Sequence, residues 1–209
     1  GMKFTQHYAG SSRCAPTRSS LLTGMHTGHT RVRDNSGYLV RRRVPLLPED
    51  VTIGEVLKQA DYRTGVIGKW GVGEEGSTGT PNNQGFDFWF GYLNQSRAHY
   101  YYQDYLWKNE KKVLYPDNPT KRTHYSHDLM TDEALAFIDR NQKKPFFLYM
   151  AYTIPHVDLD VPEDSKKPYI GKLKETKPYG TPGGQHYRYE ERPHATFAGM
   201  VSRLDRDVG

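Results

Sequence analysis

The sequence is poor in cysteine, since Cys14 is the only one among 209 residues. A single cysteine excludes an internal disulfide framework and any cysteine-rich zinc site. Cys14 is therefore either an inert, buried side chain or a chemical centre. The chain also lacks the apolar core of a signal peptide and any apolar run of membrane length, so no membrane span is predicted.

Apolar residues are sparse as well. They make up 35% of the sequence with tyrosine included, and the mean hydropathy is −0.84. This content is low for a domain that buries a core of its own. No repeat or linker divides the chain, so we expect residues 1–209 to form one incomplete domain.

The balance of charge and aromatics indicates the kind of partner. The net charge of +5 suits an anionic ligand, but the basic residues are scattered except at Arg41–Arg43 and Lys166–Lys167. Scattered charge does not form a nucleic-acid footprint, so no nucleic-acid partner is expected. Sixteen tyrosines and three tryptophans could pack a core or stack on sugar rings.

Local patterns predict alternating helices and strands. Thr52-Ile-Gly-Glu55 is a capping box, which begins a helix. Gly68-x-x-Gly71-x-Gly73 has neither the Rossmann nor the P-loop spacing of nucleotide-binding loops, so we interpret it as a turn. Residues 155–193 are rich in proline, glycine and charge, which is typical of an active-site loop or lid. The other predictions are helices over 16–23, 52–60, 126–140 and 197–208, buried strands over 63–67 and 146–153, short strands around 91–102, and a hairpin over 107–113.

The segment around Cys14 carries the strongest motif. It reads Cys14-Ala-Pro16-Thr17-Arg18-Ser-Ser-Leu-Leu-Thr-Gly, and it places Cys14 just before a helix N-terminus, where anions bind. A protein tyrosine phosphatase would need an arginine at position 20, where Ser20 stands. The segment matches the signature of formylglycine-dependent sulfatases at each defining position.

Two later segments extend this resemblance. Tyr62-Arg-Thr-Gly-Val-Ile-Gly-Lys69-Trp resembles the second motif of the family, and Ile154-Pro-His156 with Pro162 resembles its histidine segment. The resemblance implies an α/β, alkaline-phosphatase/sulfatase-like sandwich with a mostly parallel central sheet, incomplete in this chain. It also implies hydrolysis of sulfate esters of a small molecule or glycan, in the periplasm or outside the cell.

The resemblance implies roles for particular residues. Cys14 would be oxidised to formylglycine by a formylglycine-generating or anaerobic sulfatase-maturating enzyme, and its hydrate would attack sulfur. A divalent metal, usually calcium, would coordinate the diol made from Cys14. Arg18 would hold the diol, Lys69 would bind sulfate, and His156 would hydrogen-bond the sulfate or the leaving oxygen.

The sequence departs from the family pattern in two respects. Gly71 stands where the family usually has a histidine, and His99 is our predicted substrate-binding substitute. The family's metal-binding aspartates normally precede the cysteine by more than thirteen residues, and further site residues follow the segment seen here. We therefore expect residues 1–209 to be a partial catalytic domain, with weak calcium binding and negligible activity alone.

The sequence is also compatible with two other functions. Relatives use the same formylglycine on phosphorus, so a phosphonate or phosphate monoester hydrolase is one alternative. A non-catalytic protein that binds sulfated glycan is another. His26 and His29 could form a metal pair by spacing, but Gly28 between them favours a turn.

Overall fold

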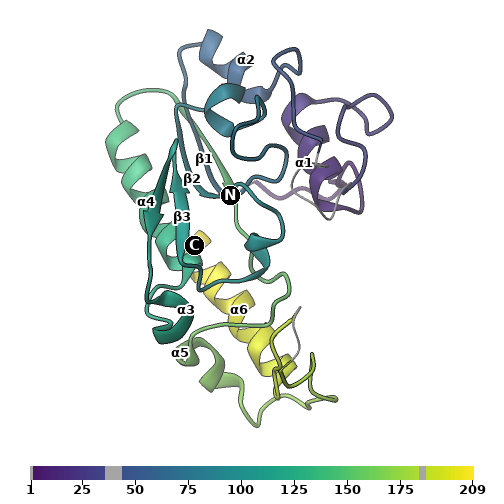
Figure 1. The fold of residues 1–209 in the computed structure, drawn as a ribbon, viewed down its shortest axis with the longest axis vertical. Coiled ribbons are helices and arrows are strands. Elements are labelled where there is room, and N and C mark those ends of the chain that lie inside the picture. Colours follow the sequence, from purple (N-terminus) through teal and green to yellow (C-terminus); the bar gives the residue numbers. More distant parts are fainter. Residues whose placement is uncertain (1, 36–43, 184–186) are drawn as a thin grey trace.

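The computed structural model describes residues 2–35, 44–183 and 187–209 (Figure 1). The basic run at Arg41–Arg43 lies outside the described residues. The described strands form one sheet of order β4-β3-β2-β1-β5. Their bounds are β1 Arg63–Lys69, β2 Phe88–Tyr92, β3 Tyr105–Lys108, β4 Lys111–Leu114 and β5 Phe146–Ala151. The helices are α1 Cys14–Thr23, α2 Ile53–Gln59, α3 Asn118–Lys121, α4 Ser126–Asn141, α5 Glu163–Lys166 and α6 Pro193–Val208.

The centre of the sheet is parallel, because β1 pairs in parallel with both β2 and β5. Strands β3 and β4 continue the sheet as an antiparallel hairpin that turns at Asn109, whose φ is 52°. The predicted α/β class and the predicted hairpin are therefore confirmed. Parallel strands deliver their carboxyl ends to one edge, where ligands of open α/β sheets gather.

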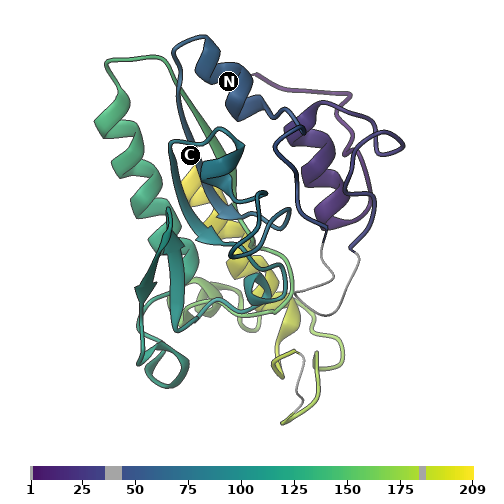
Figure 2. The same cartoon turned by 45° about the horizontal axis from the view of Figure 1, so that its top comes forward.

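The sheet has a helix on each side. In Figures 1 and 2, α4 and α1 lie on opposite sides of the strands. Neighbouring residues of β1 point to opposite faces, so Val66 joins the cluster that includes Ala15 and Leu22 of α1. Ile67 joins the cluster that includes Met130 of α4. Alternation along one strand thus fixes the two helices on the two faces.

The N-terminal helices begin and end where local chemistry predicts. Gly24 ends α1 in the left-handed region with φ 67°, which glycine adopts at little cost. Thr52 and Glu55 form the predicted capping box of α2. Val56, in the middle of α2, is 52% exposed in the described part of the chain.

Two predictions on the second half of the chain are wrong in detail. Strand β5 is half-buried along most of its length, because among the described strands it pairs with β1 alone and lies at the sheet edge. Helix α6 begins at Pro193 rather than at Phe197, and Phe197 and Val201 are exposed. Gly199 faces α5 instead, where an added Cβ would lie 2.7 Å from the Ser165 carbonyl oxygen.

The strands predicted around residues 91–102 are also displaced. The strand is β2, which ends at Tyr92, and Arg97–His99 forms a 3₁₀ turn. The Asn94 side chain causes this change, because its Oδ1 accepts hydrogen bonds from the backbone N–H groups of Ser96 and Arg97. Such local side-chain bonds favour turns over strands.

Candidate active site

A cavity of about 260 Å³ opens where the N-terminus of α1 meets the carboxyl ends of β1 and β5. Its walls include Cys14, Arg18, Lys69 and His156. The sequence motifs predict these four residues to be catalytic; Cys14 and Arg18 lie one turn apart in α1, whereas Lys69 and His156 lie much further along the chain. The fold therefore brings all four to one place.

Cys14 is the first residue of α1 and is partly exposed. The pKa of its thiol is lowered to about 6, mainly by a hydrogen bond from His156. Burial opposes this shift, and the positive charge of Lys69 adds to it. The protein therefore stabilises a negative charge at the end of this side chain.

Lys69 ends β1 and is only 4% exposed, although lysine is seldom buried. Its backbone carbonyl oxygen accepts a hydrogen bond of 2.5 Å from Arg18 Nη1. Arg18 Nη1 also lies 3.4 Å from the hydroxyl of Tyr149. Arg18 Nε is buried and has no acceptor among the described residues, so it could donate to an anion in the cavity.

His156 follows β5 and lines the cavity, where its side chain contacts Cys14. Its pKa is raised, first by the hydrogen bond to Cys14 and then by the Val157 carbonyl, while burial opposes the shift. The Tyr101 hydroxyl donates to the His156 carbonyl oxygen. His156 is therefore held by the hydrogen bond to its backbone carbonyl oxygen and by the contacts of its ring with Cys14 and the Val157 carbonyl.

His99 does not line this cavity. Its ring stacks on that of His156, with 4.7 Å between ring centroids and 17° between ring planes. The substrate contact expected of His99 stays a prediction. A side chain at Gly71 would meet Gln95 instead, since an added Cβ would lie 2.8 Å from Gln95 Cγ.

Some wall residues were not anticipated from the sequence. Tyr149, Tyr152 and Thr153 line the cavity from β5 and the residues after it. Period-two alternation along β5 could have indicated that Tyr149 points toward one face, but not which face. Asn35 was also missed, although its Oδ1 accepts a 2.9 Å hydrogen bond from the Ala15 N–H at the start of α1.

The described residues do not fit calcium by themselves. Calcium prefers several carboxylate and carbonyl oxygens, whereas this cavity presents the cations Arg18 and Lys69. Among the described residues, no group of three or more histidine, cysteine or acidic side chains could hold a metal. His26 and His29 lie in a turn, as predicted, where His26 Nδ1 accepts the Gly28 N–H at 3.0 Å.

The unmodified thiol offers a direct test of this electrostatic description. Alkylation of Cys14 by iodoacetamide should rise with pH through a midpoint near 6 and level off above it, because only the thiolate reacts. Replacing His156 with alanine should move the midpoint upward, since the largest stabilising contact is lost. His194→Ala, at an exposed position of α6, serves as the control. A midpoint typical of a free thiol in the unsubstituted protein would contradict the description.

The fold and this site define an α/β protein with a cavity lined by a helix N-terminus, a buried lysine, an arginine and a histidine. A sulfatase family model matches residues 1–209. The chain belongs to the sulfatase family. The predicted family and its partial sulfatase-like α/β fold are thereby confirmed.

Individual relatives agree with this assignment. An arylsulfatase of Hemicentrotus pulcherrimus is 34% identical over 193 residues, which cover 78% of this chain and 32% of the relative. The structure of Ps i-CgsB in complex with k-i-k-neocarrahexaose matches with a TM-score of 0.74 and 27% identity, over 97% of this chain and 44% of that one. The structure of BT4656 with its substrate D-glucosamine-2-N,6-O-disulfate matches with a TM-score of 0.61 and 25% identity, over 81% and 30%. The chain thus spans less than half the length of each.

No helix within residues 2–35, 44–183 and 187–209 is both long and apolar enough to cross a bilayer.

Proposed function

We propose that the protein hydrolyses sulfate esters of a carbohydrate, with formylglycine made from Cys14 as the source of the nucleophile. The observation that carries this proposal is the environment of the Cys14 side chain. Lys69 and His156 both stabilise negative charge there, and both lower the pKa of the thiol, while burial opposes them. An oxygen nucleophile at that position, and a sulfate beside it, would meet the same stabilisation.

Each residue of the cavity has a role in this proposal. A hydrated formylglycine supplies a hydroxyl group for attack on sulfur. Lys69 holds the sulfate oxygens and offsets their charge from a largely dehydrated position. His156, whose ring contacts the Cys14 side chain, is placed to donate a proton to the leaving alcohol oxygen. Arg18 Nε donates to the anion while Nη1 stays bonded to the Lys69 carbonyl.

We propose that His99 serves the proton-transfer step through His156, on which it stacks. This arrangement would partly replace the histidine that the family usually carries at position 71. We also retain calcium as the proposed metal, on the basis of family resemblance. Because the described residues do not supply its ligands, we derive no step through it.

Relatives support a sulfated glycan as the substrate and a location outside the cytoplasm. Two structural relatives are described with the carbohydrates k-i-k-neocarrahexaose and D-glucosamine-2-N,6-O-disulfate. An extracellular sulfatase homologue of Drosophila melanogaster is 30% identical over 190 residues, which cover 89% of this chain. We propose that the full-length protein is secreted or periplasmic and depends on a maturating enzyme for its formylglycine.

A paired assay tests this function. Full-length protein from a host that forms formylglycine is given 4-nitrophenyl sulfate, the matching phenylphosphonate ester and neocarrahexaose. We expect kcat/KM for the aryl sulfate to exceed that for the phosphonate, and sulfate to be released from the hexasaccharide. Preference for the phosphonate would contradict the proposal in favour of a phosphorus ester hydrolase. Retention of the hexasaccharide without turnover would contradict it in favour of a binding protein.

A further inference from the structure

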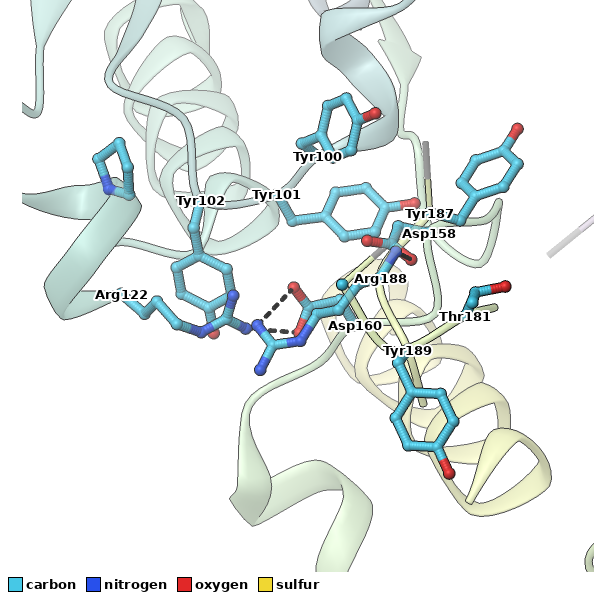
Figure 3. Close-up of a pocket in the computed structure, with 12 residues that line it drawn as sticks. Tyr100, Tyr101, Tyr102, Arg122, Asp158, Asp160, Thr181, Tyr187, Arg188 and Tyr189 are labelled. Carbon is cyan, nitrogen blue, oxygen red and sulfur yellow. Dashed lines mark hydrogen bonds and ion pairs between the residues drawn. The ribbon is translucent and has the colours of Figure 1, made fainter. Parts of the chain in front are cut away.

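Figure 3 shows a second cavity, which has a volume of about 540 Å³. Its walls are rich in tyrosine and carry both signs of charge. We call it the tyrosine cavity. It is lined by Tyr100, Tyr101, Tyr102, Tyr187 and Tyr189, with Arg122, Arg188, Asp158 and Asp160 among the other residues.

The two cavities are neighbours, because residues close together in the chain line one or the other. Ala98 and His156 line the Cys14 cavity, whereas Tyr100 and Asp158 line the tyrosine cavity. Each pair is two residues apart, a span of at most about 7 Å along an extended chain. His99 stands between the cavities, stacked on His156 and 6.1 Å from the ring of Tyr187 between centroids. One extended ligand could therefore reach both.

The charges of the tyrosine cavity are balanced within it. Figure 3 shows Arg122 and Arg188 both reaching Asp160, at 2.6 and 3.9 Å. Asp158 is 3% exposed and accepts the Arg188 backbone N–H at 3.1 Å. Burial, followed by the charge of Asp160, raises the pKa of Asp158 to about 6. A sulfate group in this cavity would face the carboxylates of Asp158 and Asp160, so its binding is disfavoured there.

The same walls suit a ligand rich in hydroxyl groups. Carboxylates accept hydrogen bonds from hydroxyl groups, and guanidinium groups donate hydrogen bonds to hydroxyl oxygens. Tyrosine rings provide apolar faces with a polar edge. Tyr189 is 39% exposed, and the Arg122 guanidinium lies 3.9 Å from the centre of the Tyr102 ring. The volume lies within the range usual for small-molecule sites.

We propose that the tyrosine cavity binds an unsulfated sugar ring of the same glycan whose sulfated unit lies at Cys14. This inference rests on the proposed function and narrows its substrate class. The substrate is then an oligosaccharide or polysaccharide in which sulfated and uncharged rings are joined, rather than a single sulfated sugar. Asp158 is a specificity residue in this arrangement, because its side chain recognises the uncharged ring.

Substitutions in the tyrosine cavity test this assignment in the full-length protein. The measured quantity is the ratio of kcat/KM for neocarrahexaose to kcat/KM for 4-nitrophenyl sulfate, which has no second ring. Asp158→Asn should lower this ratio roughly ten- to a hundredfold, as expected for loss of a hydrogen bond to a charged group. Tyr189→Ala removes an exposed wall, so it should fold and lower the ratio as well.

Asp132→Asn, at an exposed position of α4, is the matched control and should leave the ratio unchanged. An unchanged ratio in both cavity variants would overturn the proposal. So would an equal loss on both substrates, because that pattern indicates damage to His156 rather than loss of a sugar contact.

Failure of the proposed function can be told apart from failure of this inference. If the unsubstituted protein hydrolyses neither ester, calorimetry with desulfated neocarrahexaose still tests the cavity. Binding that is weakened in Tyr189→Ala would support the sugar site without catalysis. No binding to the unsubstituted protein, or equal binding to Tyr189→Ala, would overturn it.

Discussion

Replacing Lys69 with methionine is expected to lower kcat/KM for an aryl sulfate by roughly a hundred- to a thousandfold in the full-length protein. The methionine keeps most of the length of the side chain and removes its charge. Lys69 is only 4% exposed, so solvent screens its charge weakly. Its charge also contributes to the low pKa of Cys14, which indicates that it acts directly on an anion in the cavity.

Folding controls separate this loss from structural damage. The free energy of unfolding of Lys69→Met in urea is measured beside its activity, so that a loss of stability is not mistaken for the loss of a catalytic charge. Lys143→Met, at an exposed position after α4, should keep full activity. A loss of less than about tenfold in Lys69→Met would contradict the role of the charge.

Gly68→Ala is expected to destabilise the folded protein by about 3–5 kcal/mol. Gly68 has φ +120°, and an added Cβ would lie 2.1 Å from the Ala151 carbonyl oxygen in the paired strand β5. Since both atoms belong to backbone in the sheet, neither can move without breaking strand pairing. The strand that delivers Lys69 to the cavity therefore tolerates only glycine at the preceding position.

Gly76→Ala provides the comparison for Gly68→Ala. Gly76 also has a positive φ, of +80°, but an added Cβ would have no atom within 4 Å. Its substitution should cost only about 1–2 kcal/mol for the backbone conformation. The free energies of unfolding in urea give both values. Equal losses in the two variants would show that close backbone contact at Gly68 is unimportant.

Local sequence chemistry predicts the features that depend on few residues. Gly24 ends α1 and the Thr52 capping box begins α2 because caps act within one helical turn. The β3–β4 hairpin likewise depends on its own turn at Asn109. The roles expected of Cys14 and Lys69 come from the family motifs that contain them, and each residue also lies beside a predicted element end.

Features that depend on distant partners could not be predicted in the same way. The buried face of α6 is set by α5 and by Arg203, which pairs with Asp128 of α4 at 2.6 Å. Apolar periodicity alone does not contain these contacts. Similarly, nothing local to His99 indicates that its ring stacks on His156, which lies 57 residues further along the chain.

The tyrosine cavity could not be located from the sequence either. The abundance of tyrosine indicates packing or sugar contact without locating either. Tyr101 follows a 3₁₀ turn, Asp158 follows β5, and Arg188 belongs to the long segment before α6. These three residues come together only because their loops fold over the same edge of the sheet. Loop conformation does not follow from the apolar periodicity of the sequence.

The most direct test is the mass of the tryptic peptide spanning residues 14–18, from protein isolated from its native host. If Cys14 is the source of the nucleophile, the peptide has the mass in which the Cys14 side chain has become an aldehyde, with sulfur lost and oxygen gained. Unmodified Cys14, in a host whose other sulfatases carry the aldehyde, would show that Cys14 is not the source of the nucleophile.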